Sequence, residues 1–136
     1  MFARFAPWIL ALVMAFPSLA VAQTMNLNMV SVGISRYRQP GMDLKWSAAD
    51  ARQMAAAFSA NRLFARKDVN VLVDQQATIR NLHAALDLLE RRASANTMSV
   101  LFLSGHGTRD ARGHFLYTTH EYDPARAAAT CLAGEA

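Results

Sequence analysis

Three uncharged, strongly apolar runs constrain the fold of this 136-residue chain more than any other feature. They span residues 27–35, 69–73 and 98–104 and read LNMVSVGIS, VNVLV and MSVLFLS. Apolar runs of this length, free of charge, are typical of strands that are buried on both faces of a parallel sheet. We therefore predict three such strands.

Two helical patterns separate the predicted strands. The first runs from Ser47 to about Asn61, and the second begins after Thr78, a favourable N-cap residue. The apolar face of the second helix is formed by Ile79, Leu82, Leu86 and Leu89. Strands that alternate with helices imply a parallel sheet, in which ligands bind beyond the carboxyl ends of the strands. Residues 114–118 suggest a short strand or hairpin arm, and the alanine-rich stretch after Pro124 suggests no further element.

The first 22 residues have the pattern of a secretory signal peptide. Arg4 precedes an apolar run over residues 5–16, and residues 20–22 form an A-x-A cleavage site. Pro17 and Ser18 interrupt the run before it reaches the roughly 20 apolar residues that a membrane-spanning helix needs. We predict cleavage after residue 22, one domain over residues 23–136, a secreted or periplasmic protein, and no membrane span after cleavage.

The remaining composition argues against several functions. The formal net charge is +4, but the basic residues are scattered and form no stripe, so we predict no nucleic-acid binding. The single cysteine, Cys131, excludes an internal disulfide. His83 flanks the apolar face of the second helix, whereas His114 and His120 lie near acidic residues without the spacing of a known zinc motif. We predict no metal and no other cofactor.

The third apolar run leads directly into the segment Ser104-Gly105-His106-Gly107. An imidazole can act as a general acid or base near neutral pH. The flanking glycines let the backbone turn sharply and approach a substrate closely, and the Gly107 N–H can face a developing oxyanion. By itself, the pattern indicates no more than a tight turn that carries an exposed histidine.

Four segments together resemble the caspase-like superfamily, most closely its bacterial caspase-family and metacaspase-type members. Residues 30–34, 44–54, 78–80 and 100–107 read VSVGI, LKWSAADARQM, TIR and VLFLSGHG. The last segment is the most specific, and the others contribute because their order and spacing also fit. The resemblance covers about residues 29–124.

The resemblance implies an α/β fold, a three-layer caspase-haemoglobinase sandwich with a mostly parallel sheet and a short hairpin. It implies a cysteine-type endopeptidase that cleaves peptide or protein substrates after arginine or lysine. His106 would be the histidine of the Cys–His dyad, Gly107 an oxyanion-hole donor, and Asp50 an acidic residue of the S1 pocket. Asp50 has another interpretation, because it could complete a capping box with Ser47 and favour the first helical turn electrostatically. Asp43 is a weaker pocket candidate.

The cysteine nucleophile that the resemblance implies has no clear counterpart in this sequence. In caspase-type sequences the histidine lies about 50 residues upstream of the cysteine, and the family places that cysteine in an Asp-x-Cys setting after a fourth buried strand. Cys131 follows His106 by 25 residues, without such a strand, and we interpret it as an ordinary cysteine of a loop or helix start. The chain would then be a partial domain, truncated before the nucleophile strand and inactive without a C-terminal segment that supplies the cysteine.

Two alternatives remain open. The chain could be a non-catalytic caspase-like module that binds peptides or proteins, because a pocket at Asp50 and His106 needs no nucleophile. It could also be an exported α/β domain in which the SGHG segment is only structural.

Overall fold

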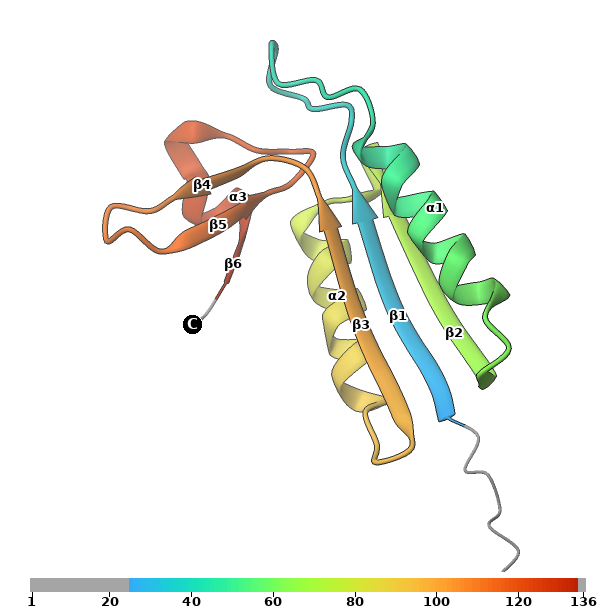
Figure 1. The fold of residues 1–136 in the computed structure, drawn as a ribbon. Coiled ribbons are helices and arrows are strands. Elements are labelled where there is room, and N and C mark those ends of the chain that lie inside the picture. Colours follow the sequence, from blue (N-terminus) through green and yellow to red (C-terminus); the bar gives the residue numbers. More distant parts are fainter. Residues whose placement is uncertain (1–24, 135–136) are drawn as a thin grey trace, which may run out of the picture.

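A three-stranded parallel sheet forms the centre of the computed structural model, which describes residues 25–134 (Figure 1). In chain order, the elements are β1 (Met25–Gly33), α1 (Ser47–Ala60), β2 (Phe64–Val73), the 3-10 helix η1 (Asp74–Gln76), α2 (Ile79–Arg91), β3 (Thr97–Ser104), β4 (Gly107–Arg109), β5 (Phe115–Thr118), the 3-10 helix η2 (Pro124–Arg126), α3 (Ala127–Thr130) and β6 (Cys131–Ala133). The signal peptide predicted over residues 1–22 lies outside the described residues and stays a prediction.

The parallel sheet has the strand order β2–β1–β3. Gly33 at the end of β1 lies level with Val73 of β2 and Ser104 of β3. All three strands therefore finish at one edge, where the following loops meet. This confirms the predicted α/β fold with a parallel sheet built from the three apolar runs.

The helices α1 and α2 pack on opposite faces of this sheet (Figure 1). The Ser31 hydroxyl donates to the Ala51 carbonyl of α1 over 2.8 Å. The Asn28 amide donates to the Leu89 carbonyl of α2 over 3.0 Å. Because odd- and even-numbered residues of a strand point to opposite faces, these two bonds assign one helix to each face.

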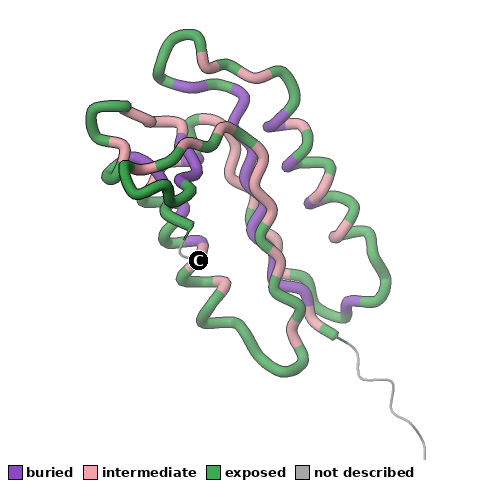
Figure 2. The backbone as a smooth tube through the Cα atoms, turned by 60° about the vertical axis from the view of Figure 1, so that its left-hand side comes forward, coloured by how far each residue is buried: buried purple, intermediate pink, exposed green. Residues whose placement is uncertain are grey.

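Burial follows from this arrangement and is deepest in β1, which has a strand on each side and a helix on each face (Figure 2). On the α1 face, Phe64 packs with the β1 residues Leu27 and Met29. A larger cluster on the other face joins β1, α2 and β5, and contains Val30, Val32, Ile34, Tyr37, Ala77, Leu82, Ala85 and Tyr117. The core therefore extends beneath the loops at the carboxyl edge.

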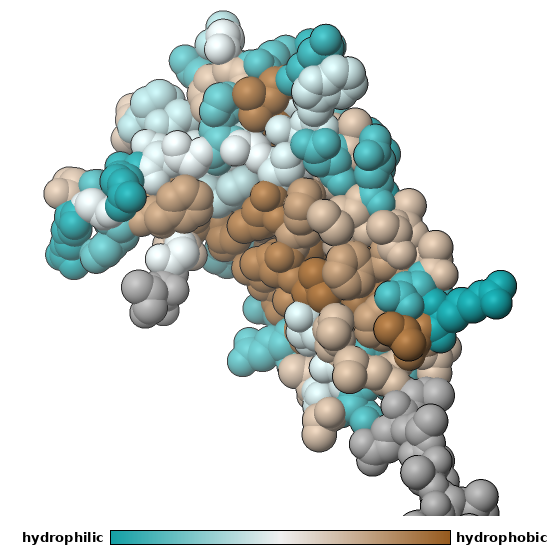
Figure 3. Space-filling view, in the orientation of Figure 1, coloured by the Kyte–Doolittle hydropathy of each residue, from teal (hydrophilic) through white to brown (hydrophobic). Residues whose placement is uncertain are grey.

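The third strand is less buried than its sequence predicts. Met98 and Leu101 are 41% and 44% exposed, and a patch of apolar surface lies in the middle of this face (Figure 3). An apolar run reveals what the two faces of a strand prefer, but not whether its outer edge is covered. Among residues 25–134, no strand pairs with the outer edge of β3.

A second, antiparallel sheet has the order β4–β5–β6. The hairpin of β4 and β5 confirms the predicted arm near residues 114–118. The expectation that no element follows Pro124 was wrong, because α3 and β6 follow and β6 pairs with β5. Three residues are too few to produce an apolar pattern that identifies a strand. None of the helices in residues 25–134 is long and apolar enough to cross a membrane.

Candidate active site

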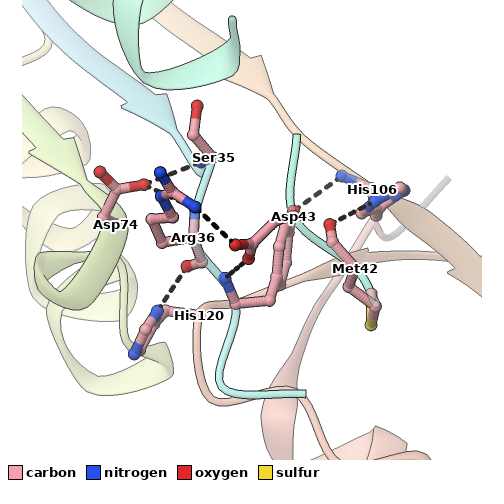
Figure 4. Close-up of polar contacts among 8 residues, drawn as sticks. Ser35, Arg36, Met42, Asp43, Asp74, His106 and His120 are labelled. Atoms are coloured by element: carbon pink, nitrogen blue, oxygen red, sulfur yellow. Dashed lines mark hydrogen bonds and ion pairs between the residues drawn. The ribbon is translucent and has the colours of Figure 1, made fainter. Parts of the chain in front are cut away.

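The candidate site lies where β1 and β3 end. The loop after β1 and the segment after β3 approach each other there, and His106 of that segment bonds to the loop (Figure 4). The loop connecting β1 to α1, residues 34–46, is called the β1–α1 loop below. Its two sides each contact His106.

The imidazole of His106 has a defined orientation. Its Nε2 atom lies 2.9 Å from the Met42 carbonyl oxygen of the β1–α1 loop. Because a carbonyl oxygen only accepts hydrogen bonds, Nε2 carries the proton in this contact. In a neutral ring the other nitrogen, Nδ1, is then unprotonated and can accept a proton. The Tyr37 ring packs nearby, with its centre 5.2 Å from the imidazole centre.

The backbone of His106 is held on both sides. Its N–H donates to the Tyr37 hydroxyl over 2.9 Å. Its carbonyl oxygen accepts from the Thr118 N–H at 3.0 Å and from the Thr118 hydroxyl at 2.9 Å. Tyr37 and Thr118 are both buried, and burial is the largest cause that raises the pKa of Tyr37. The tyrosine therefore stays a neutral hydroxyl, and His106 is fixed by two well-packed neighbours.

The Gly107 N–H points away from the hairpin partner. The bond from Thr118 N–H to the His106 carbonyl marks residues 106 and 118 as a hydrogen-bonded pair. Hydrogen-bonded and non-bonded pairs alternate along an antiparallel ladder, so Gly107 and its partner Tyr117 form a non-bonded pair. Among the described residues, no backbone bond outside the strand ladders uses the Gly107 N–H. This donor can therefore serve a group that approaches from outside β5.

Close neighbours, rather than an unusual backbone angle, explain the two glycines of this segment. A Cβ atom on Gly105 would lie 2.8 Å from the Tyr37 hydroxyl oxygen and 2.9 Å from that of Tyr117. A Cβ atom on Gly107 would meet the Phe115 ring at 2.3 Å. Neither glycine has the positive φ found at Gly41 and Gly113. The backbone bends at Gly105, directly after β3, and side chains pack tightly around both glycines.

Asp50 lies in the first turn of α1, beside the end of β3. The Ser104 hydroxyl donates to its carboxylate over 3.4 Å, which connects Asp50 to the residue two positions before His106. An open cavity of about 430 Å³ adjoins it, lined by Asp50, Gln53, Met54, Ala57 and Phe102. The site thus combines an exposed carboxylate with apolar side chains of α1 and β3.

The capping box predicted for Ser47 and Asp50 was wrong. The helix already begins at Ser47, and its N-cap residue, Trp46, makes no side-chain capping bond. A distant residue provides the cap instead, since the Ser35 hydroxyl accepts from the Ala48 N–H over 2.9 Å. A local sequence pattern cannot reveal this partner, because the bond joins residues thirteen positions apart. The Asp50 carboxylate is therefore free of any capping role.

A family model described as the caspase domain matches residues 30–135. The chain belongs to the caspase domain family. No curated protein and no solved structure matches it. The match confirms the resemblance seen in the sequence and supports membership of the cysteine peptidase superfamily that contains caspases.

The cysteine of this caspase domain is not in contact with its histidine. Cys131 opens β6 and lies level with Thr118, whereas His106 bonds to Thr118 from the other side. The two residues are thus separated by two strand spacings, about 10 Å between backbones. Cys131 is 4% exposed, and burial raises the pKa of its thiol. Its interpretation as a loop or helix-start residue was wrong, since it belongs to a strand.

The other histidines of the caspase domain bind neighbouring groups or solvent. His83 is exposed, although the sequence placed it at the boundary of the apolar face of α2. The His114 ring lies 3.1 Å from the Asp110 carboxylate. The His120 Nδ1 donates to the Arg36 carbonyl over 2.6 Å. Within residues 25–134, no group of three or more histidine, cysteine or acidic residues could hold a metal ion.

Sequence reasoning missed the residues that surround His106. Tyr37 and Met42 lie in a loop without a recognisable pattern, and Met42 contributes only a backbone carbonyl. Tyr117 donates to the Ser104 carbonyl over 3.0 Å and was covered only as part of a hairpin. The one available signal was Tyr37, an aromatic residue two positions after the first apolar run, and it has no specific meaning without the structure.

Proposed function

We propose that this chain carries the histidine part of a caspase-type cysteine endopeptidase that hydrolyses peptide bonds after arginine or lysine. Family membership supports the cysteine peptidase class. The observation that carries the proposal further is the bond between His106 Nε2 and the Met42 carbonyl. It leaves Nδ1 available for proton transfer, at the edge where the β1–α1 loop and the segment after β3 meet.

In this proposal His106 accepts the proton of a cysteine thiol through Nδ1. The thiolate then attacks the substrate carbonyl, and the protonated imidazole returns the proton to the leaving amine. Gly107 follows His106 directly, and its N–H is unused by the hairpin. It is therefore suited to stabilise the negative oxygen of the tetrahedral intermediate. No cofactor takes part.

Asp50 is the proposed determinant of the preference for basic residues. Its exposed carboxylate can pair with a guanidinium or ammonium group. The apolar side chains of Met54 and Phe102 line the same cavity and can pack on the aliphatic stem that precedes such a charge. The combination fits an arginine or lysine side chain better than an acidic or short one.

The nucleophile comes, in this proposal, from a segment outside the described residues. Cys131 is buried in β6 and makes no hydrogen bond to His106. A further strand could pair in parallel with the free lateral side of β3. Its carboxyl end would then lie beside His106. A cysteine after such a strand could reach the imidazole, so the chain without it would be a partial, inactive domain.

We also propose that the protein is exported, on the strength of residues 1–22 alone. N-terminal sequencing of secreted or periplasmic material should find Gln23 first, and a retained Met1 in a cytoplasmic protein would contradict it. For the same reason the substrates we expect are extracellular or periplasmic proteins.

The first experiment is to read the gene beyond codon 136 in all three frames. An apolar strand that ends in Asp-x-Cys would identify the segment. This segment is then produced and mixed with the purified chain, and cleavage is measured with peptide reporters that end in arginine or alanine. We expect cleavage of the arginine reporter only in the mixture. His106→Ala should lower turnover by roughly 10²–10⁴-fold, whereas Asp50→Asn should reduce only the preference for arginine, by roughly fivefold.

A non-catalytic peptide-binding module is the second candidate, because the carboxylate and cavity at Asp50 exist without a thiolate nearby. Here the chain alone should bind an arginine-ending peptide, and Asp50→Asn should weaken that binding. Binding without cleavage, together with no cysteine-bearing segment in any frame, would favour this module over the peptidase.

A further inference from the structure

Two sides of one loop hold His106, and each supplies one hydrogen bond. In the β1–α1 loop, residues 35–37 form the near side and residues 42–44 the far side. Tyr37, on the near side, accepts the backbone N–H of His106, and Met42, on the far side, accepts the ring Nε2–H. The separation of the two sides therefore sets the position of the imidazole relative to its own backbone.

Asp43 bridges the two sides with its carboxylate (Figure 4). One oxygen, Oδ1, accepts from the Tyr37 backbone N–H over 3.0 Å. The other, Oδ2, accepts from the Arg36 guanidinium over 2.8 Å. In the described part of the chain these are the side-chain bonds that cross the loop. At its base the loop is closed by a backbone bond from the Leu44 N–H to the Ser35 carbonyl, 2.8 Å long.

The near side is also anchored to the rest of the fold. The Asp74 Oδ1, just after β2, accepts from the backbone N–H groups of Ser35 and Arg36 over 2.8 and 2.9 Å. Asp74 adopts a φ of +47°, which is uncommon for residues other than glycine, and this conformation presents its carboxylate to the loop. His120 donates to the Arg36 carbonyl from beyond β5. The near side is thus a fixed reference, to which Asp43 connects the far side.

We propose that Asp43 is a positioning residue for His106, which holds the Met42 carbonyl at the distance that keeps the imidazole in its Nε2–H form with Nδ1 free. This inference rests on the proposed role of His106 as the catalytic base. Asp43 itself lies outside the reacting groups, since its carboxylate is used by Tyr37 and Arg36. Without it, the far side keeps only the Leu44 bond as a polar connection to the near side, and Met42 can move away from the ring.

The charge state of Asp43 suits this role. The Tyr37 N–H, followed by the Arg36 guanidinium, lowers the pKa of the Asp43 carboxyl below its usual range. The carboxylate is therefore ionised throughout the neutral range and remains a double acceptor. The bridge does not depend on a proton that is lost or gained near neutral pH.

Nuclear magnetic resonance of the full chain tests the proposal without any measurement of activity. The Nε2–H proton of His106 is assigned by its absence in His106→Gln. In the wild type, the bond to Met42 should protect this proton from exchange with water. In Asp43→Ala its resonance should disappear through fast exchange, and the Tyr37 amide should exchange roughly fivefold faster, the factor expected for one lost hydrogen bond of average strength.

Two further variants separate position from fold and charge. Asp43→Asn retains an oxygen that can accept from the Tyr37 N–H, so it should keep the protected resonance. Asp43→Glu keeps the charge but extends the side chain by one methylene, so it should weaken the protection even if the alanine variant folds poorly. Asp110→Ala is the matched control. It removes a carboxylate that accepts two backbone N–H groups, those of Arg112 and His114, in the hairpin loop instead.

The proposal is wrong if the Nε2–H resonance of a folded Asp43→Ala chain, with β1 amides protected as in the wild type, stays as protected as before. It is equally wrong if Asp110→Ala has the same effect, or if Asp43→Glu behaves like the wild type. These outcomes are independent of catalysis. If His106→Ala leaves cleavage intact in the reconstituted peptidase, the proposed function fails while the Asp43 measurement still stands.

Discussion

The carboxyl and amino ends of the parallel sheet are held together by different kinds of contact. At the carboxyl end, buried or half-buried side chains bond to backbone groups of distant segments, as Ser35 does to Ala48 and Tyr37 to His106. At the amino end, ion pairs on the surface lie beside the partly buried bond from Asn28 to the Leu89 carbonyl. Asp68 lies 3.2 Å from Arg66 and 3.8 Å from Arg92, and both arginines are well exposed.

This difference shows which end of the sheet holds its side chains in fixed positions. A bond between a buried side chain and a backbone group fixes both partners, whereas exposed ion pairs are screened and contribute little to stability. A catalytic site needs side chains that are held within a fraction of an ångström. The carboxyl end meets this need with the hydroxyl groups of Ser35 and Tyr37 and with carboxylates that accept backbone N–H groups of the β1–α1 loop, while the amino end only has to close the sheet.

The largest effect on this comparison is expected from Gly33→Ala at the carboxyl end. An added Cβ atom would lie 2.1 Å from the Ser47 carbonyl oxygen and 2.6 Å from the Ala51 side chain. β1 and α1 must then separate, and we expect the free energy of unfolding to fall by about 3 kcal/mol or more. Denaturant titration measures this. In Gly41→Ala only the positive φ is strained, with no atom nearby, so a loss as large as that of Gly33→Ala would argue against crowding as the cause.

A smaller loss is expected from Tyr37→Phe, which keeps the ring but removes the acceptor of the His106 N–H. Leaving this donor without a partner should cost about 1–3 kcal/mol in the free energy of unfolding. Amide exchange at His106 should accelerate at the same time. Tyr117→Phe is the matched control, because it removes a hydroxyl that donates to the Ser104 carbonyl and should leave the His106 amide protected.

The distant cap of α1 gives a prediction of intermediate size. Ser35→Ala removes the acceptor of the Ala48 N–H and should lower the free energy of unfolding by about 1 kcal/mol. Ser47→Ala should cost less than about 0.5 kcal/mol, because Ser47 provides no cap. Thermal unfolding of both variants decides the matter. The reverse order would restore the capping box suggested by the sequence.

The smallest effect is expected at the amino end. Asp68→Asn removes the charge shared by Arg66 and Arg92 and should change the free energy of unfolding by less than about 0.5 kcal/mol. Repeating the measurement in high salt should reduce even this difference, because salt screens exposed charges. A loss comparable with that of Ser35→Ala would remove the contrast between the two ends.

The strands and helices could be predicted from sequence because each has a pattern of its own. The three apolar runs became β1, β2 and β3, and Thr78 caps α2 through the Asn81 N–H as expected. The family could also be predicted, since the segment over residues 100–107 is specific. What remained hidden depends on contacts between distant segments. Ser35 caps a helix that it does not belong to, and Met42 acts through a backbone carbonyl that every residue possesses.

The position of β3 at the edge of the sheet could not be predicted from the sequence pattern either. The order of the strands depends on how the helices cross over and on which strands pair, and the sequence of one strand does not determine these. The short β6 strand was missed for a similar reason. It forms because Leu116, Tyr117 and Thr118 offer a ladder to pair with, not because Cys131, Leu132 and Ala133 favour a strand by themselves.

The burial of Cys131 turns the only sulfhydryl of the chain into a reporter of motion. A thiol reagent cannot modify it while β6 lies on β5, so the rate of labelling measures how often this short strand detaches. If labelling proceeds much faster than global unfolding, the small sheet opens as a separate unit. The labelling rate can also be measured while peptides are added. A slower rate would show that a peptide bound at the candidate site, beside β4, makes β6 detach less often although the two are not in contact.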